Sequence, residues 1–230
     1  MRILLIETAT QVCSVAIADG GKIVAKRESA EPNAHSSRLV PFIDEMLREL
    51  GITADGLDAV CVSSGPGSYT GLRIGVSTAK GICYALGKPL LSVPTLFSMA
   101  SLYYRLHPEY KGLVCPMIDA RRMECYTMVV DNGLVLRDTH ADIITEDIYN
   151  QYLDRGEVVF IGDGAEKTRP LLGNHPNARY DSGFEISAEG MLSVAEEKLN
   201  NGDTEDVAYF EPFYLKDFVA KKSVVHGLFS

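Results

Sequence analysis

A run of small and hydroxyl residues, SSGPGSYTG, fills positions 63–71 between two apolar stretches. Between a strand and a helix, the backbone N–H groups of such a loop can hold an anion, so one interpretation is a phosphate site. The glycine spacing fits neither the dinucleotide fingerprint nor a Walker loop. The alternative, which the spacing favours, is a tight turn in which Ser68 or Thr70 caps the helix. The candidate phosphate residues are Gly65, Gly67, Ser68 and Thr70.

Two acidic residues stand at the ends of predicted strands, Glu7 in the first half and Asp119 in the second. A phosphotransferase places a carboxylate at such a position, near metal and phosphate. Asp119, however, is followed by Ala120, Arg121 and Arg122, and long cations suit ion pairing better than a nucleotide site. Strand ends also carry acids for solubility, so both interpretations stay open.

No other set of catalytic residues emerges from the sequence. Ser64 and Ser68 lack the Gly-x-Ser-x-Gly pattern, and no cysteine has a histidine partner motif. His35, which precedes two serines, is better explained by the start of a helix. The five histidines lack the spacing of zinc ligands, so no metal site is expected. The five cysteines are widely spaced and mostly apolar in context, which predicts reduced, buried thiols.

The composition is that of a globular protein without a membrane span. Of 230 residues, 46% are hydrophobic and 23% are charged. The longest uncharged stretch, residues 89–104, is shorter than the roughly 20 apolar residues that a spanning helix needs. The apolar run at residues 3–6 is too short for a signal peptide. We therefore expect a cytoplasmic protein that does not bind membranes.

The net charge of −9 is unevenly distributed. Residues 1–106 carry 10 Lys and Arg against 9 Asp and Glu, which leaves +1. Residues 107–230 carry 12 against 22, which leaves −10. An acidic surface repels phosphate backbones, so we expect no tight binding of nucleic acid by the chain alone.

Hydrophobic patterns and turn residues predict two α/β domains with mixed sheets, 1–106 and 107–230. Pro41 is expected in or near the first turn of its helix. The first half should hold strands at 2–8, 12–18, 22–29, 59–63 and 90–93, with helices at 37–50, 69–86 and 94–104. The second repeats the order, with strands at 113–118, 124–130, 134–139 and 158–161 and helices at 146–153, 165–172 and 188–199.

The helix expected at 69–86 carries small residues four apart, Gly71, Gly75 and Ala79. A helical glycine costs roughly 1 kcal/mol relative to alanine, so close packing must offset that cost. The stripe packs either on the protein's own sheet or, with the helix at 37–50, on a partner. The pattern leaves both open. The second interpretation assigns the interface to Leu39, Phe42, Ile43, Met46, Gly71, Leu72, Gly75, Val76, Ala79 and Cys83.

Several of these motifs together resemble one protein family. The segments 6–10 and 13–16, the pair His35-Ser36 and the run 64–73 are similar to the bacterial tRNA threonylcarbamoyladenosine biosynthesis proteins of the TsaB, or YeaZ, family. The segments 119–126 and 212–216 match the family's later motifs. The resemblance covers nearly the whole chain.

The resemblance implies duplicated actin-like, sugar-kinase-like (ribonuclease H-like) domains, with a degenerate second half. It implies a non-catalytic subunit that binds the catalytic subunit TsaD through its first-domain helices. That complex attaches a threonylcarbamoyl group to the adenosine beside the tRNA anticodon. Further implied partners are the ATPase TsaE, tRNA through the complex alone, and a second copy of the chain when TsaD is absent.

The same resemblance bears on nucleotide binding. Residues 162–165, Gly-Asp-Gly-Ala, resemble the adenosine loop of the superfold, which adds Asp119, Gly162 and Gly164 to the candidates. Ala9 and Arg122 depart from the family's usual residues and weaken a phosphate site. We expect no firmly bound cofactor, and ATP or ADP only within the complex. The alternative function is an ATP-dependent small-molecule kinase or ATPase, with a metallopeptidase third.

Overall fold

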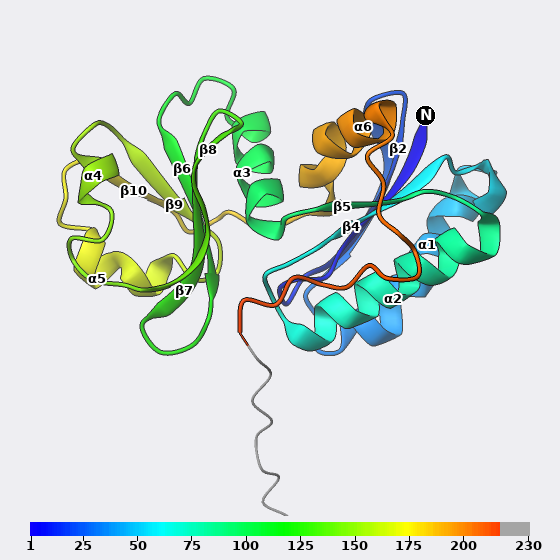
Figure 1. Cartoon of the computed structure of the whole chain (residues 1–230), viewed down its shortest axis with the longest axis horizontal. Helices are drawn as coiled ribbons and strands as arrows, with labels where there is room; N and C mark the ends of the chain where they lie inside the picture. Colours follow the sequence, from blue (N-terminus) through cyan, green and yellow to red (C-terminus); the bar gives the residue numbers. More distant parts are fainter. Residues whose placement is uncertain (217–230) are drawn as a thin grey trace, which may run out of the picture.

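The computed structural model describes residues 1–216; residues 217–230, the end of the predicted second domain, lie outside the described part. Two lobes stand side by side, each built around a five-stranded mixed sheet with helices on its faces (Figure 1). We call them lobe I, which holds β1–β5, and lobe II, which holds β6–β10. Two mixed α/β sheets are the predicted fold class.

The sheet of lobe I has the order β3-β2-β1-β4-β5. The first three strands are antiparallel neighbours, whereas β4 and β5 run parallel to β1. Gly20 and Gly21, both with positive φ, form the predicted turn between β2 and β3. The strands are β1 (Arg2–Glu7), β2 (Cys13–Asp19), β3 (Lys22–Ser29), β4 (Ala59–Ser63) and β5 (Leu90–Val93).

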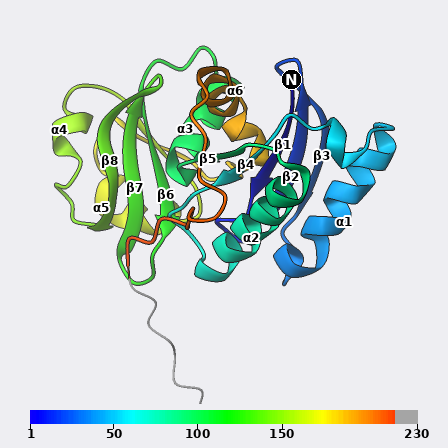
Figure 2. The same ribbon diagram turned by 45° about the vertical axis from the view of Figure 1, so that its right-hand side comes forward.

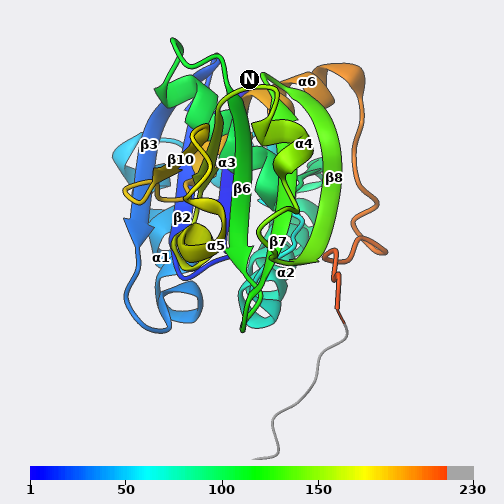
Figure 3. The same cartoon turned by 90° about the vertical axis from the view of Figure 1, so that its left-hand side faces the viewer.

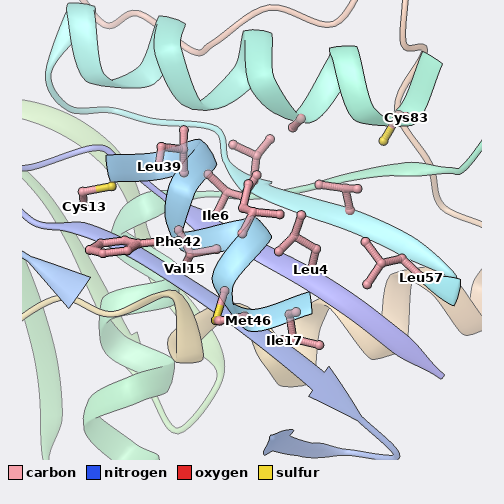
Figure 4. Close-up of a cluster of buried hydrophobic side chains, with 14 of the residues drawn as sticks. Leu4, Ile6, Cys13, Val15, Ile17, Leu39, Phe42, Met46, Leu57 and Cys83 are labelled. Carbon is pink, nitrogen blue, oxygen red and sulfur yellow. The ribbon is translucent and has the colours of Figure 1, made fainter. Parts of the chain in front are cut away.

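Helices cover both faces of this sheet because successive residues of β1 point to opposite sides. Leu4 and Ile6 pack under α1 (Ala34–Glu49) and α2 (Tyr69–Leu86), as Figure 4 shows. Ile3 and Leu5 pack instead against the 3-10 turn η3 (Ala188–Met191) and α6 (Leu192–Asn201). A further 3-10 turn, η1 (Ala54–Gly56), lies between α1 and β4.

The sheet of lobe II has the order β10-β9-β6-β7-β8, again with an antiparallel meander beside a parallel pair. Figure 3 shows this lobe facing the viewer. Its strands are β6 (Leu113–Asp119), β7 (Glu124–Asp131), β8 (Leu134–Ile143), β9 (Val158–Ile161) and β10 (Ala178–Asp181). Its helices are α3 (Thr95–Leu106), α4 (Asn150–Leu153), the 3-10 turn η2 (Glu166–Thr168) and α5 (Arg169–Leu172).

The two lobes do not divide the chain at residue 106. The α3 helix, from the predicted first domain, buries Leu96 and Met99 against β6 and β7 of lobe II. The η3–α6 segment, from the predicted second domain, buries Met191 and Ala195 against β1 and β4 of lobe I. Each half therefore lends a helix to the other lobe, and the predicted domains 1–106 and 107–230 are corrected in this respect.

Most predicted elements occur, with differences at their ends. The α2 helix has the predicted bounds, whereas α1 begins three residues earlier than predicted, so Pro41 lies inside it rather than in its first turn. Pro41 is exposed, on the side of the helix away from the sheet. The edge strand β10 was not predicted, because its sequence ARYD lacks an apolar pattern. All five cysteines are free and buried, as predicted.

Candidate functional site

A cleft of about 1120 Å³ lies between the lobes, where the ends of their central strands meet. Loops after β1, β4, β6 and β9 line it, together with the start of α1 and a C-terminal segment. The motifs singled out from the sequence thus converge on one place. Their residues at the cleft include Ala9, His35, Gly67, Ser68, Thr70, Asp119, Arg121, Arg122 and Asp163.

The glycine-rich loop packs against the protein's own backbone. A Cβ atom at Gly67 would collide with the carbonyl of Ala9, and one at Gly71 would collide with the carbonyl of Thr8. The Ser68 amide donates to the Ala9 carbonyl at 2.6 Å. The glycines are therefore needed for close approach of the β1–β2 loop.

The start of α2 is capped as the turn interpretation predicts. The Ser68 side chain accepts a hydrogen bond from the Gly71 amide at 3.2 Å, and the Gly65 amide donates to Thr95 Oγ1 at 3.1 Å. Two amides of the loop are thus already paired with side-chain oxygens. Binding of a phosphate by Gly65, Gly67, Ser68 and Thr70 stays a prediction.

Asp119, at the end of β6, is held by neighbouring cationic and backbone groups. Its carboxylate forms an ion pair with Lys167 and accepts the Arg121 amide at 2.8 Å. Partial burial alone would raise the pKa of Asp119, but the hydrogen bond from Lys167 holds it below its usual value. Lys167 also donates to the Glu124 carbonyl at 2.7 Å, which fixes the ammonium group beside the carboxylate. Asp119 is thus a structural anchor.

The hairpin after Asp119 turns through two arginines with positive φ, Arg121 at 70° and Arg122 at 50°. This conformation disfavours side chains other than glycine, asparagine and aspartate. Both arginines line the cleft.

The loop that resembles an adenosine site also packs on its own lobe. The Gly164 amide donates to the Met117 carbonyl at 3.1 Å, and a Cβ atom at Gly162 would lie 2.5 Å from that oxygen. Asp163 Oδ1 accepts the Asp119 amide at 3.0 Å, and burial raises the pKa of the Asp163 carboxyl. These residues hold the end of β6 in place, and contact of Asp119, Gly162 and Gly164 with nucleotide stays a prediction.

Glu7, the acid at the end of the first predicted strand, is fully buried behind the cleft. Its Oε1 atom accepts the Ala9 amide at 2.7 Å and the Ser63 hydroxyl at 2.8 Å, whereas Oε2 is buried without a partner. Burial raises the pKa of Glu7 to about 7. Glu7 therefore ties the end of β1 to the end of β4.

Burial of the cysteine side chains makes them poor nucleophiles. Desolvation raises the pKa of Cys13 and of Cys83 to about 11, and raises that of Cys125 to about 12. A nucleophilic cysteine needs the opposite environment, which is electropositive and partly exposed.

The small-residue stripe of α2 faces the protein's own sheet, where Ala79 lies in the buried core. A Cβ atom at Gly75 would collide with Thr8 Oγ1 at the end of β1. All ten predicted interface residues are buried inside lobe I, so the prediction that they form an exposed docking face is corrected. These residues are Leu39, Phe42, Ile43, Met46, Gly71, Leu72, Gly75, Val76, Ala79 and Cys83.

The structure adds cleft residues that the sequence did not single out as a site. Phe213, Tyr214 and Lys216 line the cleft from the C-terminal side. The available signal was the motif at 212–216, to which no role could be given. Within residues 1–216, no three His, Cys, Asp or Glu side chains are grouped so that they could hold a metal ion. The same residues include no helix with the length and apolar character to cross a membrane.

The duplicated sheets and the cleft between them define the class of protein. A hexokinase of the ROK class from Thermus thermophilus, at 13% identity, aligns with 87% of the chain and 100% of its own at a TM-score of 0.51, and shares the fold alone. The fold is the duplicated actin-like, sugar-kinase-like α/β fold. A family model described as TsaD, tRNA N6-adenosine threonylcarbamoyltransferase, matches residues 26–153.

Proteins of similar sequence and structure identify the family within this fold class. The TsaB protein of Escherichia coli K12, a tRNA threonylcarbamoyladenosine biosynthesis protein, is 32% identical over 97% of this chain and 98% of its own. That of Haemophilus influenzae is 29% identical over 97% of both. The solved structure of YeaZ from Pseudomonas aeruginosa superposes with a TM-score of 0.79 at 27% identity, covering 93% of this chain and 99% of its own. The chain belongs to the TsaB, or YeaZ, family of tRNA threonylcarbamoyladenosine biosynthesis proteins.

Proposed function

We propose that the chain is a non-catalytic subunit in tRNA threonylcarbamoyladenosine biosynthesis, which binds TsaD and supports transfer of the threonylcarbamoyl group. The observation that carries this proposal is that the candidate site residues at the cleft make contacts within the chain itself. Asp119 is paired with Lys167, and the loop glycines are packed on the chain's own backbone. Catalysis needs reactive groups that are positioned around a substrate, whereas these residues make contacts that stabilise the fold.

The partner face lies on the outside of α1 and α2. Buried side chains fill the inner faces of both helices, so TsaD meets the outward residues. Val40 is 59% exposed and Tyr84 is 85% exposed, and both are large apolar side chains on this surface. Ser77 and Gly81 share a face of α2 with Tyr84 and are exposed and small, which lets another helix approach closely. When TsaD is absent, a second copy of the chain uses the same face as a homodimer.

The remaining partners follow from the complex. TsaE is a further partner in the same assembly. tRNA is bound only through the complex, because the acidic chain offers few cations for phosphate contacts. ATP or ADP is bound only within that assembly, in the cytoplasm, where tRNA is modified.

A glycine-to-arginine exchange tests the partner face. A Cβ atom at Gly81 meets nothing within 4 Å, so Gly81→Arg fits the isolated chain and improves helix propensity. An arginine on the face blocks close approach, so affinity for TsaD should fall at least roughly tenfold, equivalent to about 1.4 kcal/mol. Calorimetric titration with TsaD from the same source measures the affinity, and thermal unfolding measures the stability.

The matched control is Gly156→Arg, which places the same side chain in lobe II where a Cβ atom also meets open space. Its affinity for TsaD should stay unchanged. Equal affinity of Gly81→Arg and the unaltered chain would remove the partner face from α2. Failure of the unaltered chain to bind TsaD at all would refute the proposed function itself.

A further inference from the structure

The chain after α6 crosses from one lobe to the other at the mouth of the cleft. Figures 1 and 2 show this orange-to-red segment leaving α6, passing α2 and ending near β7. It begins with an isolated bridge between Glu205 and Leu90, on the edge of the sheet of lobe I. Lys80 of α2 then donates to the carbonyls of Ala208 at 3.1 Å and Phe210 at 2.9 Å. The segment is thus attached to lobe I along its length.

At the cleft, the same segment meets the glycine-rich loop. The Phe213 amide donates to the Ser64 carbonyl at 2.7 Å, directly after β4. A Cβ atom at Gly65 would lie 2.6 Å from the Phe213 carbonyl oxygen, so only a glycine lets the segment lie there. The Tyr214 ring packs on the Tyr69 ring with centroids 5.0 Å apart. The first glycine of the loop therefore accommodates the main chain of this segment.

Two residues further on, the segment reaches lobe II. Lys216 forms an ion pair with Glu124, the first residue of β7. Glu124 belongs to the hairpin that carries Arg121 and Arg122, and its carbonyl also holds Lys167. Phe213, Tyr214, Leu215 and Lys216 all line the cleft, so the segment forms part of its wall.

We propose that residues 212–216 are a clasp: the glycine-rich loop is a docking site for this segment of the same chain, and the docked segment ties lobe II to lobe I. Docking limits how far the cleft opens. The ligand of the loop is an extended peptide, held by a main-chain hydrogen bond and an aromatic contact. This assignment is independent of any binding to TsaD.

The test measures the distance between lobes in the full-length chain. Ser193→Cys on α6, which covers the face of the lobe I sheet opposite to α1 and α2, and Asp138→Cys on β8 place one exposed thiol on each lobe, and the native cysteines are buried. Spin labels on both thiols report the distance distribution. In the Tyr214→Ser/Lys216→Glu variant, the distribution should become longer and broader. The Phe213 amide should exchange hydrogen roughly tenfold faster, because a ring contact and an ion pair are lost.

Two controls separate the clasp from a general loss of structure. Tyr209→Ser changes a tyrosine of the same segment that is 83% exposed, and should leave both measurements unchanged. Tyr214→Phe keeps the ring and should also leave them unchanged. If the double variant exchanges faster but keeps the original distance distribution, the segment does not tie the lobes and the proposal fails. Unchanged exchange of the Phe213 amide would equally refute it.

Discussion

At the scale of single residues, several positions that resemble a ligand site are explained by contacts within the chain. Gly67 and Gly71 admit the β1–β2 loop, and Gly75 admits the side chain of Thr8. Each glycine carries a conformational cost that close packing offsets. Buried carboxyl groups at the strand ends then act on stability, and their effects can be measured.

Gly75→Leu should lower the free energy of unfolding. The new Cβ atom would collide with Thr8 Oγ1, and overpacking of a core costs typically ~1–3 kcal/mol. Urea unfolding of the isolated chain measures the change. Gly81→Leu is the control on the same helix, because its Cβ atom meets open space and its stability should stay equal or rise. Equal stability of the two variants would place Gly75 at the surface.

Glu7 should make stability fall as the pH rises. Its pKa is about 7 in the fold, above the ordinary value of 4.5, so the carboxyl group ionises at a lower pH in the unfolded chain. The stabilisation from protonated Glu7 is fully present below pH 4.5 and is lost as the pH rises through about 7. A difference of 2.5 pKa units corresponds to on the order of 3 kcal/mol.

Glu7→Gln cannot ionise, so it should flatten this part of the pH profile. The measurement is the difference in unfolding free energy between the two proteins from pH 4.5 to pH 8. That difference should change progressively in favour of Glu7→Gln as the pH rises. A pH-independent difference would mean that Glu7 is ionised in the fold throughout.

At the scale of elements, polar contacts tie the outermost strand of lobe II to its neighbours. Arg137 of β8 pairs with Asp142, Nη2 lying 2.7 Å from Oδ1. Thr127 of β7 and Tyr149, just before α4, donate to the same carboxylate at 2.5 Å and 2.9 Å. Burial alone would raise the pKa of Asp142, but these hydrogen bonds hold it below its usual value.

Arg137→Met should destabilise lobe II strongly. It leaves the buried Asp142 carboxylate without its cation, a change that costs about 3–5 kcal/mol. The matched control is Arg179→Met, which breaks an exposed ion pair with Glu157 and should cost at most about 1 kcal/mol. Chemical unfolding of both variants compares the two losses. Similar losses would show that the buried pair contributes no more than a surface pair.

At the scale of the whole molecule, the two lobes keep the cleft of an actin-like fold while their own groups occupy its wall. Helices α3 and α6 are exchanged between the lobes, and the segment 205–216 runs back along lobe I. The lobes therefore share covalent and packing connections at several places.

We expect the isolated chain to hydrolyse neither ATP nor peptides above background. Asp119 is ion-paired with Lys167, and within residues 1–216 no three His, Cys, Asp or Glu side chains are grouped so that they could hold a metal ion. Phosphate release and peptide cleavage are measured on the purified chain and on Asp119→Ala. Turnover that is present in the unaltered chain and lost in Asp119→Ala would support the alternative of a kinase or ATPase.

Most of the local structure could be predicted from the amino-acid pattern alone. Apolar periods and turn residues predict the strands of both sheets except β10, and the bounds of α2, because these depend on neighbours in the chain. Ser68, which caps α2, was one of the two capping residues that the sequence predicted. This prediction is possible because a cap forms between residues within one helical turn. The family resemblance rested on such local motifs as well.

The packing partners of those elements, in contrast, follow from how the whole chain folds. The same stripe of small residues would occur in the sequence whether Gly75 contacted Thr8 or a helix of a partner. Helical periodicity identifies which residues share a face of the helix, but not what that face packs against. Lys167 beside Asp119 and Phe213 against Gly65 are contacts between residues distant in the chain. Such contacts form when the sheets and helices assemble, since burial of apolar surface selects the arrangement of the whole chain and not of one segment.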